Sequence, residues 1–174
     1  AGIGKDAAFL QSAGIGMVNL AFTMLGLYLI DRLGRKKLML FGSIGYIISL
    51  SAVAMAFYFN AVGGMIVPVL LFLFIASHAI GQGAVIWVFI SEIFPNSVRA
   101  YGQSFGSSIH WILAAIITTV FPIFASKFGP APIFLFFACM MVLQLLWVIF
   151  RMPETKGIPL EELEEKLLTH KSNV

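Results

Sequence analysis

Five long apolar runs, all free of Asp, Glu, Lys and Arg, occupy most of this chain. They cover residues 7–30, 38–59, 65–90, 100–126 and 133–150. A helix needs about 20 apolar residues to cross the hydrocarbon core of a bilayer, so every run but the last is comfortably long enough. The pattern predicts an all-α, polytopic membrane protein with five transmembrane helices joined by short links.

The composition agrees with a bilayer as the solvent for these helices. Hydrophobic residues make up 60% of the chain, charged residues only 11%, and the mean hydropathy is +0.97. Soluble domains contain roughly 25% charged residues, and a chain of this size could not bury so much apolar surface in a core of its own. The first run is too long for a signal peptide and has no basic segment before it.

Positive charges are distributed unevenly between the two ends of the predicted helices. Nine of the eleven lysines and arginines share one side of the membrane: Arg32, Arg35, Lys36, Lys37, Arg99, Arg151, Lys156, Lys166 and Lys171. Lys5 and Lys127 fall on the other side. Cytoplasmic loops carry an excess of Lys and Arg, so we expect the links 31–37 and 91–99 and the segment 151–174 to be cytoplasmic. The net charge of +3 then reflects orientation and does not indicate nucleic-acid binding.

Residues 151–174 differ from the rest of the chain because they are polar and interrupted by prolines. We expect residues 1–150 to form the membrane domain and residues 151–174 a cytoplasmic tail. From Pro159 the tail predicts a short amphipathic helix with Pro at its first position. Its apolar stripe is Leu160, Leu163 and Leu167, opposed by Glu161, Glu162, Glu164 and Glu165. Such a helix either docks on basic protein loops or remains a solvated cap.

Polar side chains gather on one face of the first and fourth predicted helices at about 100° per residue. The first face holds Gln11, Ser12, Gly16, Asn19 and Thr23, and the fourth holds Gln103, Ser104, Ser107, Ser108, His110, Trp111 and Thr118. Polar groups at membrane depth are costly and typical of transport pathways, so we expect both faces to line a cavity. Close helix packing explains the serines as well. The second and fifth helices lack such a face and are predicted to be lipid-facing supports.

The third predicted helix is interrupted near its middle by "SHAIGQGAVIW". Gly81 and Gly83 weaken a helix, and an interrupted helix indicates a transporter substrate site. Close packing against a neighbouring helix is the alternative for either glycine. Trp87 precedes the charged link by a full turn, so a cavity position is as consistent with its spacing as an interfacial one. His78 has no carboxylate nearby in the sequence and is expected to be a packing or hydrogen-bonding residue.

Patterns that support catalysis or metal binding do not occur in this sequence. No cluster has the spacing of a metal site, no serine, histidine and acid form a plausible triad, and no glycine-rich loop could bind phosphate. The single cysteine, Cys139, lies inside an apolar run. We therefore expect neither an enzyme nor a cofactor.

Three motifs in order along the chain resemble those of a known family. "DRLGRKK" is similar to the RxGRR/K loop of the sugar porter family in the major facilitator superfamily, "WVFISEIFPNSVR" to its W-x-x-x-[SA]-E-[IL]-F-x-x-x-x-R segment, and "MPETKG" to its PETKG signature. The resemblance implies that the five spans are the eighth to twelfth helices of a twelve-helix bundle. The first seven helices would then be missing from this chain.

The resemblance also implies roles for single residues at the substrate site. Trp87 falls where the family has a substrate-contacting tryptophan, and Asn19 matches a sugar-binding asparagine. His110 and Trp111 fall where the family has an amide residue and a second tryptophan near the sugar. Gln11 shares the polar face of Asn19 and joins these substrate-binding candidates.

A second group of residues matches the ion pairs at the cytoplasmic side of the family. Asp31 and Arg35 lie in the first motif, and Glu92 and Arg99 in the second. In the family these pairs latch the two halves of the transporter together and break on inward opening. The resemblance implies the same role here, with the missing N-terminal half as a partner.

Two departures from the family pattern concern the substrate site. The family often has GPGPxxW in the third span, where this chain has "GQGAVIW", with Gln82 and Ala84 at the proline positions. His110 replaces the usual asparagine or glutamine. Helix flexibility and sugar preference are therefore expected to differ.

Taken with the family resemblance, these patterns predict a transporter of the plasma membrane. It would move a monosaccharide by alternating access, either as a proton symporter or as a facilitative uniporter. A transporter-like receptor that binds sugar without moving it is the main alternative, although such receptors usually carry long soluble tails. A five-helix membrane fragment without activity is the third reading.

Overall fold

The computed structural model describes residues 5–158, and the regular secondary structure within them is entirely helical. The elements are α1 (Lys5–Leu33), α2 (Arg35–Tyr58), α3 (Ile66–His78), a π-helix η1 (Ala79–Gly83), α4 (Ala84–Glu92), α5 (Arg99–Phe128) and α6 (Pro130–Phe150). Because α3, η1 and α4 follow one another without a break, they form one span. The amphipathic helix predicted from residue 159 lies outside the described residues.

Five helices of the described part are long and apolar enough to cross a membrane, as the pattern of apolar runs predicted. Each observed helix end lies within three residues of the predicted one. Two of the links are single glycines with positive φ, Gly34 at 95° and Gly129 at 76°. Such a φ is strained for any residue with a Cβ atom, so glycine allows two long helices to meet in a tight turn.

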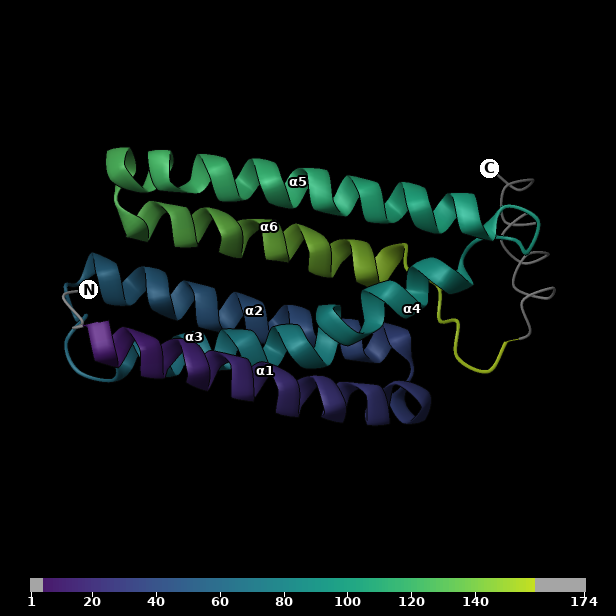
Figure 1. Ribbon diagram of the computed structural model, residues 1–174, viewed down its shortest axis with the longest axis horizontal. Coiled ribbons are helices and arrows are strands. Elements are labelled where there is room, and N and C mark those ends of the chain that lie inside the picture. The colour runs from purple at the N-terminus through teal and green to yellow at the C-terminus, as the bar shows by residue number, and fades with distance from the viewer. Residues whose placement is uncertain (1–4, 159–174) are drawn as a thin grey trace.

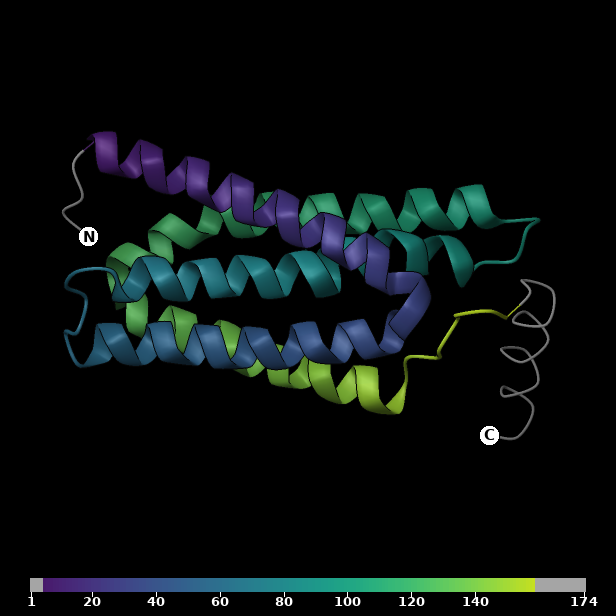
Figure 2. The same cartoon turned by 90° about the horizontal axis from the view of Figure 1, so that it is seen from below.

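The helices form an elongated bundle in which α2 packs most extensively against α6, and α5 lies beside α6 (Figure 1). The view from below shows α3 running between α1 and α2 (Figure 2). The α1–α2 turn, the link between α4 and α5, and the segment after α6 lie at one end of the bundle (Figure 1). Both charged links and the start of the tail therefore share one end, as the chain order predicted.

Burial differs strongly between the spans. The most apolar window of α2 is 50% buried, and α2 contacts α1, α3, α4 and α6. In contrast, the window in α5 is 0% buried and the window in α1 only 11%. The prediction that the second helix faces lipid is therefore wrong for half of its residues, because its small side chains let several neighbours pack around it.

Two buried serines illustrate how α2 tolerates polar side chains in the bundle interior. Ser43 donates to the carbonyl of Met39 at 2.7 Å, and Ser49 donates to the carbonyl of Gly45 at 2.8 Å. Each hydroxyl thus finds its acceptor one turn back on the same helix, which removes most of the cost of burial.

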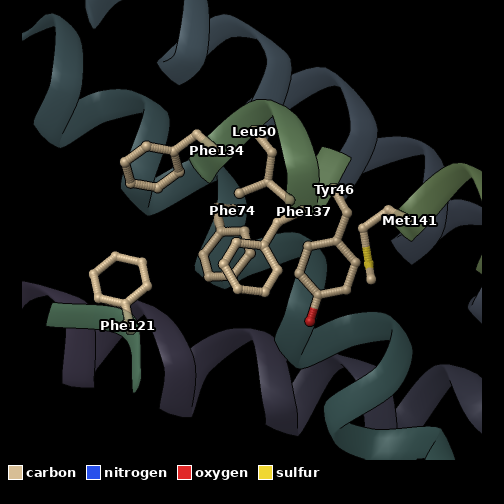
Figure 3. A pocket seen from close by; sticks show the side chains of 7 residues that line it. All are labelled: Tyr46, Leu50, Phe74, Phe121, Phe134, Phe137 and Met141. Carbon is tan, nitrogen blue, oxygen red and sulfur yellow. The ribbon is translucent and has the colours of Figure 1, made fainter. Parts of the chain in front are cut away.

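A cavity of about 280 Å³ opens between α2, α3, α5 and α6 (Figure 3). It is lined by Tyr46, Leu50, Phe74, Phe121, Phe134, Phe137 and Met141. In Figure 3 these side chains consist mainly of carbon, with the Tyr46 hydroxyl as the oxygen among them. A sugar needs several convergent polar groups, so this cavity is not the candidate substrate site.

Candidate functional site

Charged side chains from three parts of the sequence meet at the end of the bundle that holds the charged links. We call this cluster the charged junction; it consists of Asp31, Arg35, Glu92, Glu154 and Thr155. Asp31 lies near the end of α1, Arg35 begins α2, and Glu92 ends α4. The last two residues follow α6 in the extended segment.

Arg35 is the centre of the junction. Its guanidinium makes a two-pronged contact with the Glu92 carboxylate, Nη2 to Oε1 at 2.7 Å and Nε to Oε2 at 3.1 Å. Its Nη1 donates to Asp31 Oδ1 at 3.1 Å. The Arg35 and Glu92 side chains are 11% and 20% exposed, whereas Asp31 is 78% exposed. Bidentate, partly buried pairs are stronger than exposed ones, so the Arg35–Glu92 pair dominates this group.

Glu154 caps the start of α2 from the other end of the chain. Its carboxylate accepts the backbone N–H groups of Arg35 at 2.9 Å and Lys36 at 3.1 Å. These first-turn amides have no partner within their own helix, and a carboxylate also interacts favourably with the positive end of the helix dipole. Gly34, the residue before the helix, offers no side-chain cap. A Cβ atom at Gly34 would lie 2.5 Å from Glu154 Oε2, so this position needs glycine for space as well as for φ.

Further bonds join the segment after α6 to the other two motifs. Thr155 Oγ1 donates to Glu92 Oε2 at 2.6 Å, and Lys156 Nζ donates to the carbonyl of Arg32 at 2.6 Å. Lys36 Nζ donates to the carbonyl of Ile149, at the end of α6, at 3.0 Å. The "MPETKG" segment was predicted as a family signature and not as part of the ion-pair group, which it joins in the structure. The signal in the sequence was the glutamate and lysine of this segment, since the other two motifs also carry acidic and basic residues that could pair with them.

Arg99 is the fourth predicted gate residue, and it does not join the others. Its Nε and Nη2 atoms are buried and have no hydrogen-bond partner among residues 5–158. The structure thus brings Asp31, Arg35 and Glu92 together and leaves Arg99 apart from them. Two buried guanidinium nitrogens without an acceptor are costly to the folded state.

A second group of predicted residues lies away from the charged end, where α4 and α5 face one another. We call Trp87, His110 and Trp111 the aromatic wall. The His110 ring lies 5.2 Å from the Trp87 ring and 5.3 Å from the Trp111 ring, with both pairs edge to face. Trp87 is 41% exposed and Trp111 65% exposed. The wall therefore leaves aromatic surface and an imidazole exposed on the outside of the described bundle.

The two candidates on α1 are separate from this wall in the described part of the chain. Asn19 is exposed, and its Oδ1 accepts a hydrogen bond from Thr23 Oγ1 at 3.3 Å on the same helix. Gln11, two turns earlier, is partly exposed. Among residues 5–158, no hydrogen bond or ring contact joins either residue to Trp87, His110 or Trp111. Both amides keep hydrogen-bonding capacity free for a bound molecule.

The interruption of the third span takes the form of a π-helix and not of a gap. The η1 segment, Ala79–Gly83, contains both predicted helix-breaking glycines, Gly81 and Gly83. His78 precedes it and contacts the Tyr46 hydroxyl through Nδ1, so it is a hydrogen-bonding residue as expected. π-Helical turns inside α-helices frequently mark functional sites.

The chemistry available at these two groups is recognition and ion pairing. Among the described residues, no three His, Cys, Asp or Glu side chains are grouped so that they could hold a metal ion. Cys139 is exposed on α6. The charged junction can hold elements together, and the aromatic wall can contact an amphipathic ligand.

Comparisons with known proteins agree with the motifs. Residues 1–167 match the family model described as "Sugar (and other) transporter". The chain is 36% identical over 164 residues to the arabinose-proton symporter of Bacillus subtilis (strain 168), covering 94% of this chain and 35% of the relative. It is 34% identical over 170 residues to the glucose facilitated diffusion protein of Zymomonas mobilis subsp. mobilis (strain ATCC 31821 / ZM4 / CP4), covering 94% of this chain and 36% of the relative.

The fold is similar to that of a solved transporter of the same superfamily. The structure of the proton:xylose symporter XylE bound to 6-bromo-6-deoxy-D-glucose matches with a TM-score of 0.87 and 33% identity, covering 95% of this chain and 36% of that chain. This chain therefore spans about a third of the length of the proteins that it resembles.

Proposed function

Because this chain belongs to the sugar transporter family of the major facilitator superfamily, we propose that the complete protein moves a monosaccharide across the plasma membrane by alternating access. The aromatic wall is the observation that carries this proposal. Its two tryptophans and its histidine lie exposed on spans that also carry polar side chains. The relatives named as sugar symporters and facilitators support the same substrate class.

The residue types of the wall suit a sugar. A monosaccharide presents hydroxyl groups, which need donors and acceptors, and C–H faces, which pack well on aromatic rings. Asn19 and Gln11 supply amides, His110 supplies an imidazole, and Trp87 and Trp111 supply rings. We propose that these five residues face one cavity in the complete protein, where the missing helices provide the opposite side.

The mode of coupling has two candidates, each supported by a relative. The B. subtilis relative is named a proton symporter, and the Z. mobilis relative is named a facilitated diffusion protein. A proton partner and facilitated diffusion are therefore both compatible with this part of the chain.

The charged junction is proposed to be cytoplasmic and to act as a latch between two halves of the transporter. The uneven distribution of cations supports the orientation. The two buried nitrogens of Arg99 that lack an acceptor within residues 5–158 support the latch, because a carboxylate from another part of the complete protein would satisfy them. Separation of such pairs provides the two discrete states that alternating access needs.

This organisation implies that the chain is one part of a membrane domain and does not transport alone. Residues 1–150 form the membrane-embedded part and residues 151–174 a cytoplasmic tail. The exposed faces of α1 and α5 support this view, since polar groups facing lipid are costly and a partner would cover them.

Uptake of labelled monosaccharides by cells expressing the complete protein tests the function. Saturable uptake that a protonophore abolishes indicates a symporter, and saturable uptake that survives it indicates a uniporter. Trp87→Ala tests the aromatic wall in the same assay and should lower uptake at equal expression. Sugar binding without any saturable uptake would contradict transport and indicate a receptor.

A further inference from the structure

The π-helix of the third span lies against the most buried helix of the bundle. Gly81 in η1 and Gly42 in α2 approach so closely that a Cβ atom on Gly81 would lie 2.7 Å from the Gly42 Cα atom. Gly45 of α2 lies against the side chain of Ser77, just before the π-helix. Backbones this close transmit small shifts of one helix to the other, because there is no flexible side chain between them.

Two cross-helix contacts hold the π-helix to α2, one at each end. At its start, His78 Nδ1 contacts the Tyr46 hydroxyl. Near its end, Gln82 Nε2 donates to Ser43 Oγ at 3.2 Å, and Ser43 is fully buried. Gln82 stands at a position where the family pattern often has proline, which has no side-chain donor.

Gln82 is energetically unfavourable as a residue that only fills space between two helices. Its Oε1 atom is buried without a hydrogen-bond partner in the described part of the chain. A buried acceptor that lacks a donor destabilises the folded state, whereas an apolar side chain of similar length would fill the same space without this cost. The amide therefore serves something other than the stability of the helix pair.

The direction of Trp87 depends on the conformation of the π-helix. Trp87 lies on α4, five residues after Gln82. A π-helical turn holds one more residue than an α-helical turn, so conversion of η1 to α-helix would rotate α4 about its axis by roughly the 100° that one residue subtends. That rotation would carry Trp87 away from His110, its neighbour in the aromatic wall.

We propose that Gln82 is a positioning residue: its hydrogen bond to Ser43 keeps η1 in the π conformation and thereby holds Trp87 in the aromatic wall. Gln82 does not contact substrate in this role and acts through Trp87. The expected effect of Gln82 on sugar affinity rests on the proposed function. The expected rotation of α4 does not depend on the proposed function.

The rotation of α4 can be measured without sugar by thiol labelling of the complete protein. Cys139 is first replaced by Ala, and single cysteines are then placed at Trp87, which is 41% exposed, and at Val85, which is 0% exposed. A charged, water-soluble thiol reagent should label position 87 much faster than position 85. In Gln82→Met the ratio of the two rates should fall about three- to tenfold, the factor that one interhelical hydrogen bond in a membrane supplies.

A matched control separates the π-helix from the polar cluster as a whole. Gln144 also donates to Ser43 Oγ, at 3.4 Å, but it lies on α6 and not in the π-helix. Gln144→Met should leave the labelling ratio unchanged, whereas Ser43→Ala, which removes the acceptor and keeps a small side chain, should reproduce Gln82→Met. In the protein with native Trp87 and Val85, Gln82→Met should weaken sugar binding more than it lowers the maximal transport rate.

The outcomes are distinguishable. An unchanged labelling ratio in both folded variants, Gln82→Met and Ser43→Ala, would overturn the proposal, and so would an equal fall in Gln144→Met. If the parent protein binds no sugar, the proposed function fails, and the labelling ratio still decides the role of Gln82.

Discussion

The charged junction and the aromatic wall differ in how completely their side chains are used within the chain. Arg35 and Glu154 of the junction each make several hydrogen bonds, and those bonds connect the two ends of the sequence. In the wall, Trp87 and His110 contact each other through their rings and make no hydrogen bond within residues 5–158, and large parts of their surfaces are open. A saturated cluster stabilises structure, whereas an unsaturated one is free to bind something else.

This contrast predicts how substitutions in the two groups should differ in their effects. Substitutions in the junction should change the stability of the protein before they change sugar affinity. Substitutions in the wall should do the reverse. The following four predictions concern the junction, the contacts beside it and the separate substrate-site candidate Asn19 in the complete protein, in order of decreasing effect.

Gly34→Ala should be the most damaging single change. It introduces a Cβ atom at a φ of 95° and pushes it against Glu154, so the turn is strained and the cap of α2 is displaced. We expect a loss of about 2–3 kcal/mol in unfolding free energy, measured by thermal unfolding in detergent. Gly16→Ala is the control, because nothing lies within 4 Å of a Cβ atom there. Equal stability of the two variants would show that the turn is not under this constraint.

Glu92→Gln should cost more stability than Asp31→Asn. Glu92 makes two bonds to Arg35 and accepts a third from Thr155, and its side chain is 20% exposed. Charge-assisted bonds of this kind contribute about 1.5–3 kcal/mol. Asp31 is 78% exposed, and exposed pairs contribute less than about 1 kcal/mol. Denaturation midpoints compare the two variants, and the reverse order would remove Glu92 from the centre of the junction.

Asn19→Ala should weaken sugar binding about ten- to hundredfold while expression and thermal stability stay near normal. Its side chain is exposed, and its one hydrogen bond comes from Thr23 on the same helix, so little packing depends on it. Equilibrium binding of labelled sugar and thermal unfolding are measured on the same preparation. Poor stability with unchanged affinity would assign Asn19 to helix packing and take it out of the substrate site.

Lys36→Met should have the smallest effect of the four. Lys36 Nζ bonds the carbonyl of Ile149 at the end of α6, and a cation at a helix C-terminus contributes about 0.3–1 kcal/mol. Lys37→Met is the matched control, since Lys37 is exposed and makes no such bond. A thermal-shift measurement at low and high salt should show the difference shrinking as salt screens the contact. A difference that is absent at low salt would mean that the Lys36 contact contributes nothing.

The sequence alone determined the spans and their order. A bilayer sets one length for every spanning helix, so an uninterrupted apolar run of that length identifies the element and its ends, as the five observed helices confirm. It also determined that the charged links gather at one end, because short links between antiparallel spans leave no other arrangement. These features depend on local chain geometry and on the solvent, both of which are visible in the order of residues.

Only the tertiary structure decided which distant side chains meet. Glu154 caps a helix that begins 119 residues earlier, Arg99 stands apart from the group that it was expected to join, and Gln82 crosses to Ser43. It also decided that the glycines of the third span form a π-helix, since their close contact with α2 supplies the packing that a lone helix would lack. Helical periodicity specifies a face, but it does not specify the rotation and depth at which two faces pack. Those depend on the shapes of all the neighbouring side chains at once.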